Sequence, residues 1–139
     1  MADQGVKQIT DYLERSRDVV EDAIHSREFL SSIADITDAI TDSLRAGGKL
    51  LTAGNGGSAG DAQHIAGEFV SRLNYDRAPA AAIALTTDTS VITAIGNDYG
   101  YDKVFERQVL ALGRPGDVFV ALSTSGRSPS ILKAMSAAR

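Results

Sequence analysis

The sequence predicts an α/β fold, a three-layer sandwich with a parallel sheet, preceded by two N-terminal helices. From Lys49 onward the order strand, loop, helix occurs three times, which is typical of parallel strands joined by right-handed crossovers. The third predicted strand, 118–122, is apolar throughout, as expected when both faces of a strand are covered. Two long amphipathic helical patterns come before any strand.

The composition fits one globular domain and excludes several classes of protein. The chain has 139 residues, 43% of them hydrophobic and 23% charged. Its net charge of −4 argues against a general nucleic-acid binder, and no apolar run approaches the roughly 18 residues that span a bilayer. It has no cysteine and begins with polar residues, so we expect a cytoplasmic protein without nucleic-acid or membrane partners.

The two N-terminal helices are predicted from apolar residues at helical spacing. The first carries Ile9, Leu13, Val20 and Ile24; the second carries Leu30, Ile33, Ile40 and Leu44 and ends at the pair Gly47-Gly48. A helical pair of this kind either packs against another subunit or covers the chain's own core. The sequence leaves both possibilities open.

The remaining elements follow from short apolar runs and turn residues. Strands are predicted at 49–53, 80–85 and 118–122, and helices at 59–73, at about 104–112 and from Pro129 onward, with Ser128 as the cap of the last helix. The segment 86–101 is predicted to be a polar loop that contains a short apolar turn, 91–95.

Two polar loops lie between a predicted strand and a predicted helix, at the sheet edge where open α/β folds bind ligands. The first, Gly54 to Ser58, offers backbone N–H groups that glycine leaves uncrowded. The second, Ser123 to Ser128, offers four hydroxyls. Helix N-termini attract anions, so the pair of loops predicts an anion site, with tight capping turns as the alternative. A dinucleotide site is a weaker match because Asp88 lies too far along, and no P-loop is present.

The predicted helix after the first loop carries a candidate reactive pair. His64 and Glu68 are four residues apart, on the side opposite the apolar residues Ala62, Ile65, Ala66, Phe69 and Leu73. Such a pair can share a divalent metal or move protons, or it can be a weak pair on a solvated face. His25 has no evident partner. Asn97-Asp98, in a loop flanked by glycines, is either an Asx turn or a clamp for sugar hydroxyls.

Four motifs together resemble the phosphoheptose isomerase family of SIS (sugar isomerase) domain proteins. They are Gly54-Asn55-Gly56-Gly57-Ser58, the run from Asp61 to Phe69, the stretch from Ala94 to Gly100, and Ser123-Thr124-Ser125-Gly126. The resemblance covers the whole chain. It implies a flavodoxin-like SIS domain over 1–139, with a helical extension at about 1–46.

The resemblance also implies a function. Family members are aldose–ketose isomerases (intramolecular oxidoreductases) that convert sedoheptulose 7-phosphate to D-glycero-D-manno-heptose 7-phosphate for lipopolysaccharide or related glycans, as homotetramers with one zinc per subunit. By this resemblance Glu68 is the catalytic base, and His64 and Glu68 are metal ligands. The implied substrate-binding residues are Asn55, Gly56, Gly57, Ser58, Glu68, Asn97, Asp98, Ser123, Thr124, Ser125 and Ser128.

Family members continue past the position that matches Arg139, so the resemblance implies that the C-terminal strands and helix are absent here. The continuation supplies a glutamine and a histidine as the remaining zinc ligands, and the chain alone is therefore expected to be inactive. Two alternatives stay open. One is a non-catalytic regulator similar to the DnaA initiator-associating protein, which lacks the glutamate that matches Glu68. The other is an isomerase of another sugar phosphate.

Overall fold

The computed structural model describes residues 2–139, which form two compact units. The first unit is Met1–Asp38 and the second is Ala39–Arg139. Because helix α2 (Arg27–Arg45) runs from the first unit into the second, the boundary falls inside an element rather than in a linker.

The first unit consists of helix α1 (Ala2–His25) and the beginning of α2. Ser26 separates the two helices, and its hydroxyl accepts a hydrogen bond from the backbone N–H of Phe29 at 3.3 Å. Five apolar side chains of α1 are between 59% and 64% exposed: Val6, Ile9, Leu13, Val20 and Ile24. The helices predicted from spacing are therefore confirmed, and their apolar stripe is exposed in the single chain.

The second unit is built on a three-stranded parallel sheet with the order β2-β1-β3. The strands are β1 (Leu50–Gly54), β2 (Ala82–Ala84) and β3 (Val118–Leu122). Leu50 of β1 pairs with Ala82 on one side and with Val118 on the other. The sheet confirms the predicted parallel α/β class.

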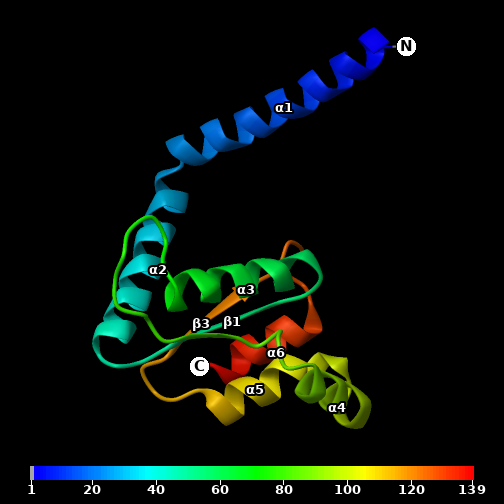
Figure 1. Ribbon diagram of the computed structural model, residues 1–139. Coiled ribbons are helices and arrows are strands. Elements are labelled where there is room, and N and C mark those ends of the chain that lie inside the picture. Colours follow the sequence, from blue (N-terminus) through cyan, green and yellow to red (C-terminus); the bar gives the residue numbers. More distant parts are fainter. Residues whose placement is uncertain (1) are drawn as a thin grey trace. The chain divides into compact units, whose positions relative to one another are not determined.

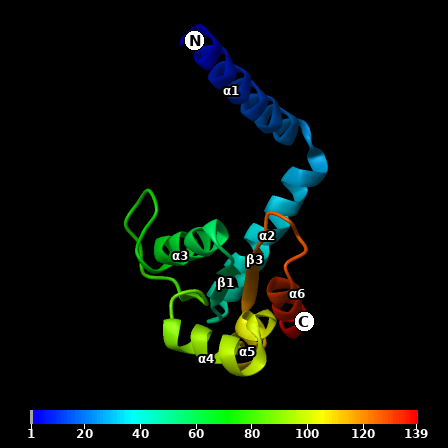
Figure 2. The same ribbon diagram turned by 90° about the vertical axis from the view of Figure 1, so that its right-hand side faces the viewer.

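Helices cover both faces of this sheet (Figures 1 and 2). Helix α3 (Gly57–Val70) lies on one face, and the other face carries a layer of helices. That layer contains α4 (Thr89–Tyr99), the short 3-10 helix η1 (Tyr101–Lys103), α5 (Val104–Leu112) and α6 (Pro129–Ala137). None of the helices described in residues 2–139 is both long enough and apolar enough to cross a bilayer.

The central strand β1 places alternate side chains in the two layers. Leu51 and Ala53 belong to the main apolar core, which includes Phe105 and Ile131 of the helical layer. Thr52 is fully buried on the opposite face, where its hydroxyl donates to the backbone oxygen of Ala62 in α3 at 2.9 Å. This bond fixes α3 against the strand that it follows.

The segment 86–101 was predicted to be a loop, and that prediction was wrong: most of it is helix α4. The carboxylate of Asp88 accepts a hydrogen bond from the N–H of Val91 at 2.9 Å and caps the helix. Val91 and Ile92 pack against the core, and Ile95 is part of it, so tertiary packing stabilises a helix too short to be evident from its sequence. Asn97 and Asp98 consequently lie in the last turn of α4 rather than in a loop.

Three smaller predictions were also wrong. Strand β2 spans only Ala82–Ala84 of the predicted 80–85, and Leu73 lies beyond the end of α3 and is exposed. Every residue of β3 is only partly buried, although its apolar sequence indicated cover on both faces. Since β3 pairs only with β1, it is an edge strand in this structure.

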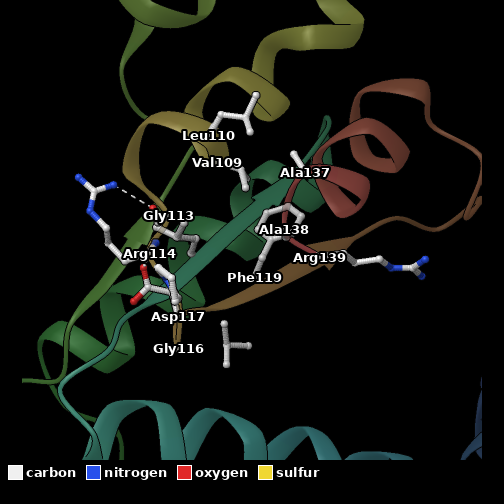
Figure 3. Close-up of a pocket in the computed structure, with 13 residues that line it drawn as sticks. Val109, Leu110, Gly113, Arg114, Gly116, Asp117, Phe119, Ala137, Ala138 and Arg139 are labelled. Atoms are coloured by element: carbon white, nitrogen blue, oxygen red, sulfur yellow. Dashed lines mark hydrogen bonds between the residues drawn. The ribbon is translucent and has the colours of Figure 1, made fainter.

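The amino end of β3 is fixed by Asp117. Its carboxylate accepts hydrogen bonds from the backbone N–H of Lys49 at 2.9 Å and of Arg114 at 2.8 Å, and from the Lys49 ammonium at 2.5 Å. A cavity of about 430 Å³ lies beside Asp117, and neither of the two predicted ligand loops lines it. Figure 3 shows its apolar lining, with Val109, Leu110, Phe119 and Ala137, and the side chains of Arg114 and Arg139 extending away from it.

Candidate functional site

The glycine loop is a tight turn between β1 and α3. A Cβ on Gly54 would lie 2.4 Å from the backbone oxygen of Ser58, so only glycine fits there. Gly56 has a φ of +56°, a conformation that L side chains rarely adopt. Gly56 is also the N-cap of α3 and has no side chain to bond the first turn. Within that turn, the N–H groups of Ser58 and Ala59 donate to the backbone oxygens of Asn55 and Gly56 at 3.1 and 3.0 Å.

The serine loop follows β3 and uses its hydroxyl oxygens as acceptors. The Ser123 hydroxyl accepts from the N–H of Gly126 at 3.1 Å, and the Ser125 hydroxyl accepts from the N–H of Arg127 at 3.2 Å. These bonds engage lone pairs and leave the hydroxyl protons to be donated. Thr124 lies between the two serines and is exposed.

Asn55 joins the two loops. Its Nδ2 donates to the hydroxyl of Ser128 at 2.9 Å and to the hydroxyl of Ser130 at 3.0 Å. Ser128 occupies the N-cap position of α6, as predicted, but its side chain does not bond the helix N–H groups. The predicted cap position is therefore confirmed, while the Ser128 hydroxyl accepts a hydrogen bond from Asn55 rather than from the helix.

His64 and Glu68 are neighbours on α3, with 3.2 Å between His64 Nε2 and Glu68 Oε1. The imidazole is 75% exposed and the carboxylate 31% exposed. Arg77 fixes the helix end at this point, because its guanidinium donates to the backbone oxygens of Glu68 at 2.7 Å and of Phe69 at 2.9 Å.

The pair offers one imidazole nitrogen and one carboxylate, both of them donors that zinc accepts. Residues 2–139 contain no group of three or more His, Cys, Asp or Glu side chains placed to hold a metal ion. The pair therefore fits half of a four-ligand zinc site. The other histidine, His25 on α1, has a partner within its own helix, since its Nδ1 lies 2.8 Å from the backbone oxygen of Glu21.

Asn97 and Asp98 form a second polar pair, with Asn97 Nδ2 donating to Asp98 Oδ1 at 2.7 Å. Both side chains are exposed. Within residues 2–139 no hydrogen bond links this pair, or the His64–Glu68 pair, to either loop. The structure thus joins the glycine and serine loops directly and presents the other two pairs separately.

Sequence reasoning missed Tyr101 and Ser130. The Tyr101 hydroxyl donates to Asn55 Oδ1 at 2.8 Å, and the Ser130 hydroxyl lies 3.1 Å from that of Ser128. Tyr101 also lines a cavity of about 130 Å³ beside the glycine loop, together with Thr86 and Phe105. The only sequence signal was the position of Tyr101 after Gly100, which gave no reason to connect it with Asn55.

An ion pair holds Tyr101's short helix against α6. The ammonium of Lys133 donates to the carboxylate of Asp102, the residue after Tyr101. This hydrogen bond lowers the pKa of Asp102 and raises the pKa of Lys133, so both groups stay charged over the neutral range. The pair therefore helps to keep Tyr101 near the serine loop.

Comparison with known proteins identifies the family of the chain. The SIS domain family matches residues 11–139, which makes the chain an SIS-domain protein. The phosphoheptose isomerase of Burkholderia pseudomallei (strain K96243) is 51% identical over 139 residues, which are 100% of this chain and 71% of the relative.

Two solved structures are similar as well. The phosphoheptose isomerase of Neisseria gonorrhoeae is 42% identical with a TM-score of 0.86, over 95% of this chain and 67% of the other. The phosphoheptose isomerase of Francisella tularensis is 36% identical with a TM-score of 0.90, over 96% of this chain and 69% of the other. The chain belongs to the phosphoheptose isomerase family, a family of sugar phosphate isomerases.

Proposed function

We propose that this protein is an aldose–ketose isomerase that interconverts sedoheptulose 7-phosphate and D-glycero-D-manno-heptose 7-phosphate in the cytoplasm, in the synthesis of heptose for lipopolysaccharide. The observation that carries the proposal is the Glu68 carboxylate beside the His64 imidazole, on the helix that the glycine loop opens. The family relationship supports the class of reaction, and the two joined loops support a phosphate ester as the group that is bound.

Binding of the substrate uses the two loops and α4. The hydroxyls of Ser123, Thr124, Ser125 and Ser128 donate to the phosphate. Asn55 supports Ser128 from the first loop, where Gly56, Gly57 and Ser58 approach the sugar. Asn97 and Asp98, at the end of α4, bind sugar hydroxyls.

The isomerisation requires a base that takes a proton from one carbon and returns it to the neighbouring carbon, through an enediol. Glu68 is the proposed base because its carboxylate is partly exposed and can accept a proton from the substrate. His64 and Glu68 are also the proposed zinc ligands, and zinc, when bound, supplies positive charge that stabilises the negative charge developing on the sugar oxygens. The remaining two ligands are proposed to lie beyond Arg139.

The test of the base uses isomerisation of sedoheptulose 7-phosphate. We expect negligible turnover by the 139-residue chain, and turnover by a fusion of this chain to the C-terminal part of the Burkholderia relative that it does not cover. In that fusion Glu68→Gln should lower kcat by about 10²-fold or more. The exposed residue Glu28 provides the matched control, since Glu28→Gln removes a carboxylate from α2 and leaves turnover unchanged. Full activity of the Glu68→Gln fusion would contradict the proposed base.

The metal is tested separately by the zinc content of the same fusion after dialysis. His64→Ala should lose zinc, whereas His25→Ala, which removes the other histidine of the chain, should keep it. Equal zinc in the two variants would contradict the proposed ligand.

The alternative of a non-catalytic regulator is less well supported. The regulator that the sequence resembles lacks the glutamate matching Glu68, whereas here both His64 and Glu68 are present and adjacent. An isomerase of another sugar phosphate is tested by offering arabinose 5-phosphate and a hexosamine phosphate to the same fusion.

A further inference from the structure

A continuous chain of hydrogen bonds runs from Tyr101 to the serine loop. The Tyr101 hydroxyl donates to Asn55 Oδ1 at 2.8 Å, and Asn55 Nδ2 donates to Ser128 at 2.9 Å and to Ser130 at 3.0 Å. The hydroxyls of Ser128 and Ser130 are 3.1 Å apart. The chain thus connects η1, the glycine loop and the first turn of α6.

The orientation of the Asn55 amide decides the direction of these bonds. Both protons of Nδ2 are donated to serine hydroxyls, so each serine uses a lone pair, and not its proton, toward Asn55. If the amide were rotated by half a turn, its oxygen would face the serines and would attract their protons. Tyr101 stabilises the observed orientation because its hydroxyl donates to Oδ1 on the other side.

The burial of the two serines decides which of them has a proton to offer a ligand. Ser130 is 2% exposed, and within residues 2–139 the acceptor that its hydroxyl reaches is Ser128. Ser130 therefore donates to Ser128. Ser128 is only partly buried and accepts from both Asn55 and Ser130, so its own proton is left for a group outside the chain.

We propose that Tyr101 is a positioning residue for phosphate binding, acting through Asn55 and Ser130 to hold the Ser128 hydroxyl as a donor to the phosphate. This inference rests on the proposed function, since it takes the phosphate ester to be the ligand of the serine loop. Tyr101 itself need not touch the phosphate. The Tyr101 hydroxyl fixes the orientation of the Asn55 amide, and through it the direction of the hydrogen bonds that lead to Ser128.

The test compares Tyr101→Phe with the unchanged chain by ¹H–¹⁵N NMR titration with inorganic phosphate and with sedoheptulose 7-phosphate. We expect about fivefold weaker binding of both, the effect of one hydrogen bond. The side-chain NH₂ resonances of Asn55 should shift in the unbound variant, which a general loss of stability would not cause. Tyr99→Phe is the matched control, because the Tyr99 ring lies 3.9 Å from the Arg107 guanidinium carbon and Phe keeps that ring.

Ser130→Ala provides a second, independent variant, because it removes the hydroxyl that donates to Ser128 and leaves the bonds from Tyr101 to Asn55 and from Asn55 to Ser128 in place. It should weaken phosphate binding by a similar factor. The double variant should be no weaker than either single one, since both act through the same chain of bonds. Additive losses, or unchanged phosphate affinity in both single variants, would overturn the positioning role while leaving the proposed function intact. If the unchanged chain binds neither probe, the phosphate site of the proposed function fails, and this inference fails with it.

Discussion

Gly54 shows how a single residue determines the shape of the candidate site. The backbone oxygen of Ser58 lies 2.4 Å from where a Cβ on Gly54 would be, which is closer than a real Cβ contact. The close approach lets the chain turn from β1 directly into α3. The glycine loop therefore depends on Gly54 for packing, apart from any role in binding.

We expect Gly54→Ala to lower the free energy of unfolding by about 1–3 kcal/mol, because the methyl group meets backbone that cannot rotate away. Gly60→Ala is the matched control within α3, where a Cβ meets nothing within 4 Å. It should raise stability by about 0.5–1 kcal/mol, through helix propensity. Urea denaturation of the two variants measures both effects, and equal stabilities would contradict the packing argument.

Asp117 is the residue whose charge contributes most clearly to stability. Its burial raises the pKa, but hydrogen bonds from the Lys49 ammonium and from the N–H groups of Lys49 and Arg114 lower it more, so the pKa in the fold lies below 3.8. A carboxyl group whose pKa is lower in the fold than in the unfolded chain stabilises the fold at pH values above the unfolded pKa. That contribution is lost as the pH falls below 3.8 and through the folded value.

Accordingly, Asp117→Asn should cost about 2 kcal/mol of stability at pH 7 and a smaller amount at pH 3, which lies below the unfolded pKa of 3.8, where part of the charge's contribution is lost. The measurement is the urea midpoint at both pH values. Asp11→Asn serves as the control, because it removes one member of an exposed pair with Lys7 and should change little at either pH. If Asp117→Asn lowered the free energy of unfolding equally at both pH values, the charge of Asp117 would not be the source of the stabilisation.

At the scale of elements, helix α4 begins at a single side-chain cap. Asp88 accepts the N–H of Val91, and the helix carries Asn97 and Asp98 of the proposed sugar site at its other end. Asp88→Ala should lower stability by about 1 kcal/mol, because a helix of 11 residues has few other bonds to replace the cap. Asn is an equally good cap, so Asp88→Asn should retain the stability, and urea denaturation distinguishes the two variants.

The elements that the sequence predicted correctly are those whose own residues define them. The strands β1 and β3 are short apolar runs bounded by glycines or turns, and α1 and α2 have long apolar periods. Helix α4 was missed because its packed face depends on partners elsewhere in the chain, while the Asp88 cap is local and a weak signal by itself.

The candidate site was predictable to a similar extent. The His64–Glu68 pair follows from helical spacing and is confirmed as a contact. The bond from Asn55 to Ser128 joins residues 73 positions apart, and Tyr101 reaches Asn55 across 46 positions, so neither follows from local pattern. The roles of these residues in binding and catalysis stay predictions.

For the whole molecule, the apolar stripe of α1 is exposed in the single chain, and we propose that it packs between subunits in the homotetramer that the family resemblance implies. Ile9 and Leu13 are 64% and 61% exposed, at a spacing that places them on one face of the helix. Replacing both with Asp should shift the mass measured by light scattering after gel filtration toward the monomer. Exchanging Glu14 and Asp18 for Gln and Asn changes polar residues of α1 and should leave the mass unchanged. A monomeric unchanged chain would contradict the proposal.

The central position of β1 also has a consequence for the order of folding. Strand β1 is synthesised well before β3, which is its second partner in the sheet. The bonds between Lys49 and Asp117, next to this pairing, close a loop of 68 residues. Loop closure of this kind costs chain entropy before any pairing compensates for it, which slows folding. On the ribosome, Asn55 emerges long before Ser128, so the bond between the two loops cannot form until the 73 residues that follow Asn55 have been synthesised.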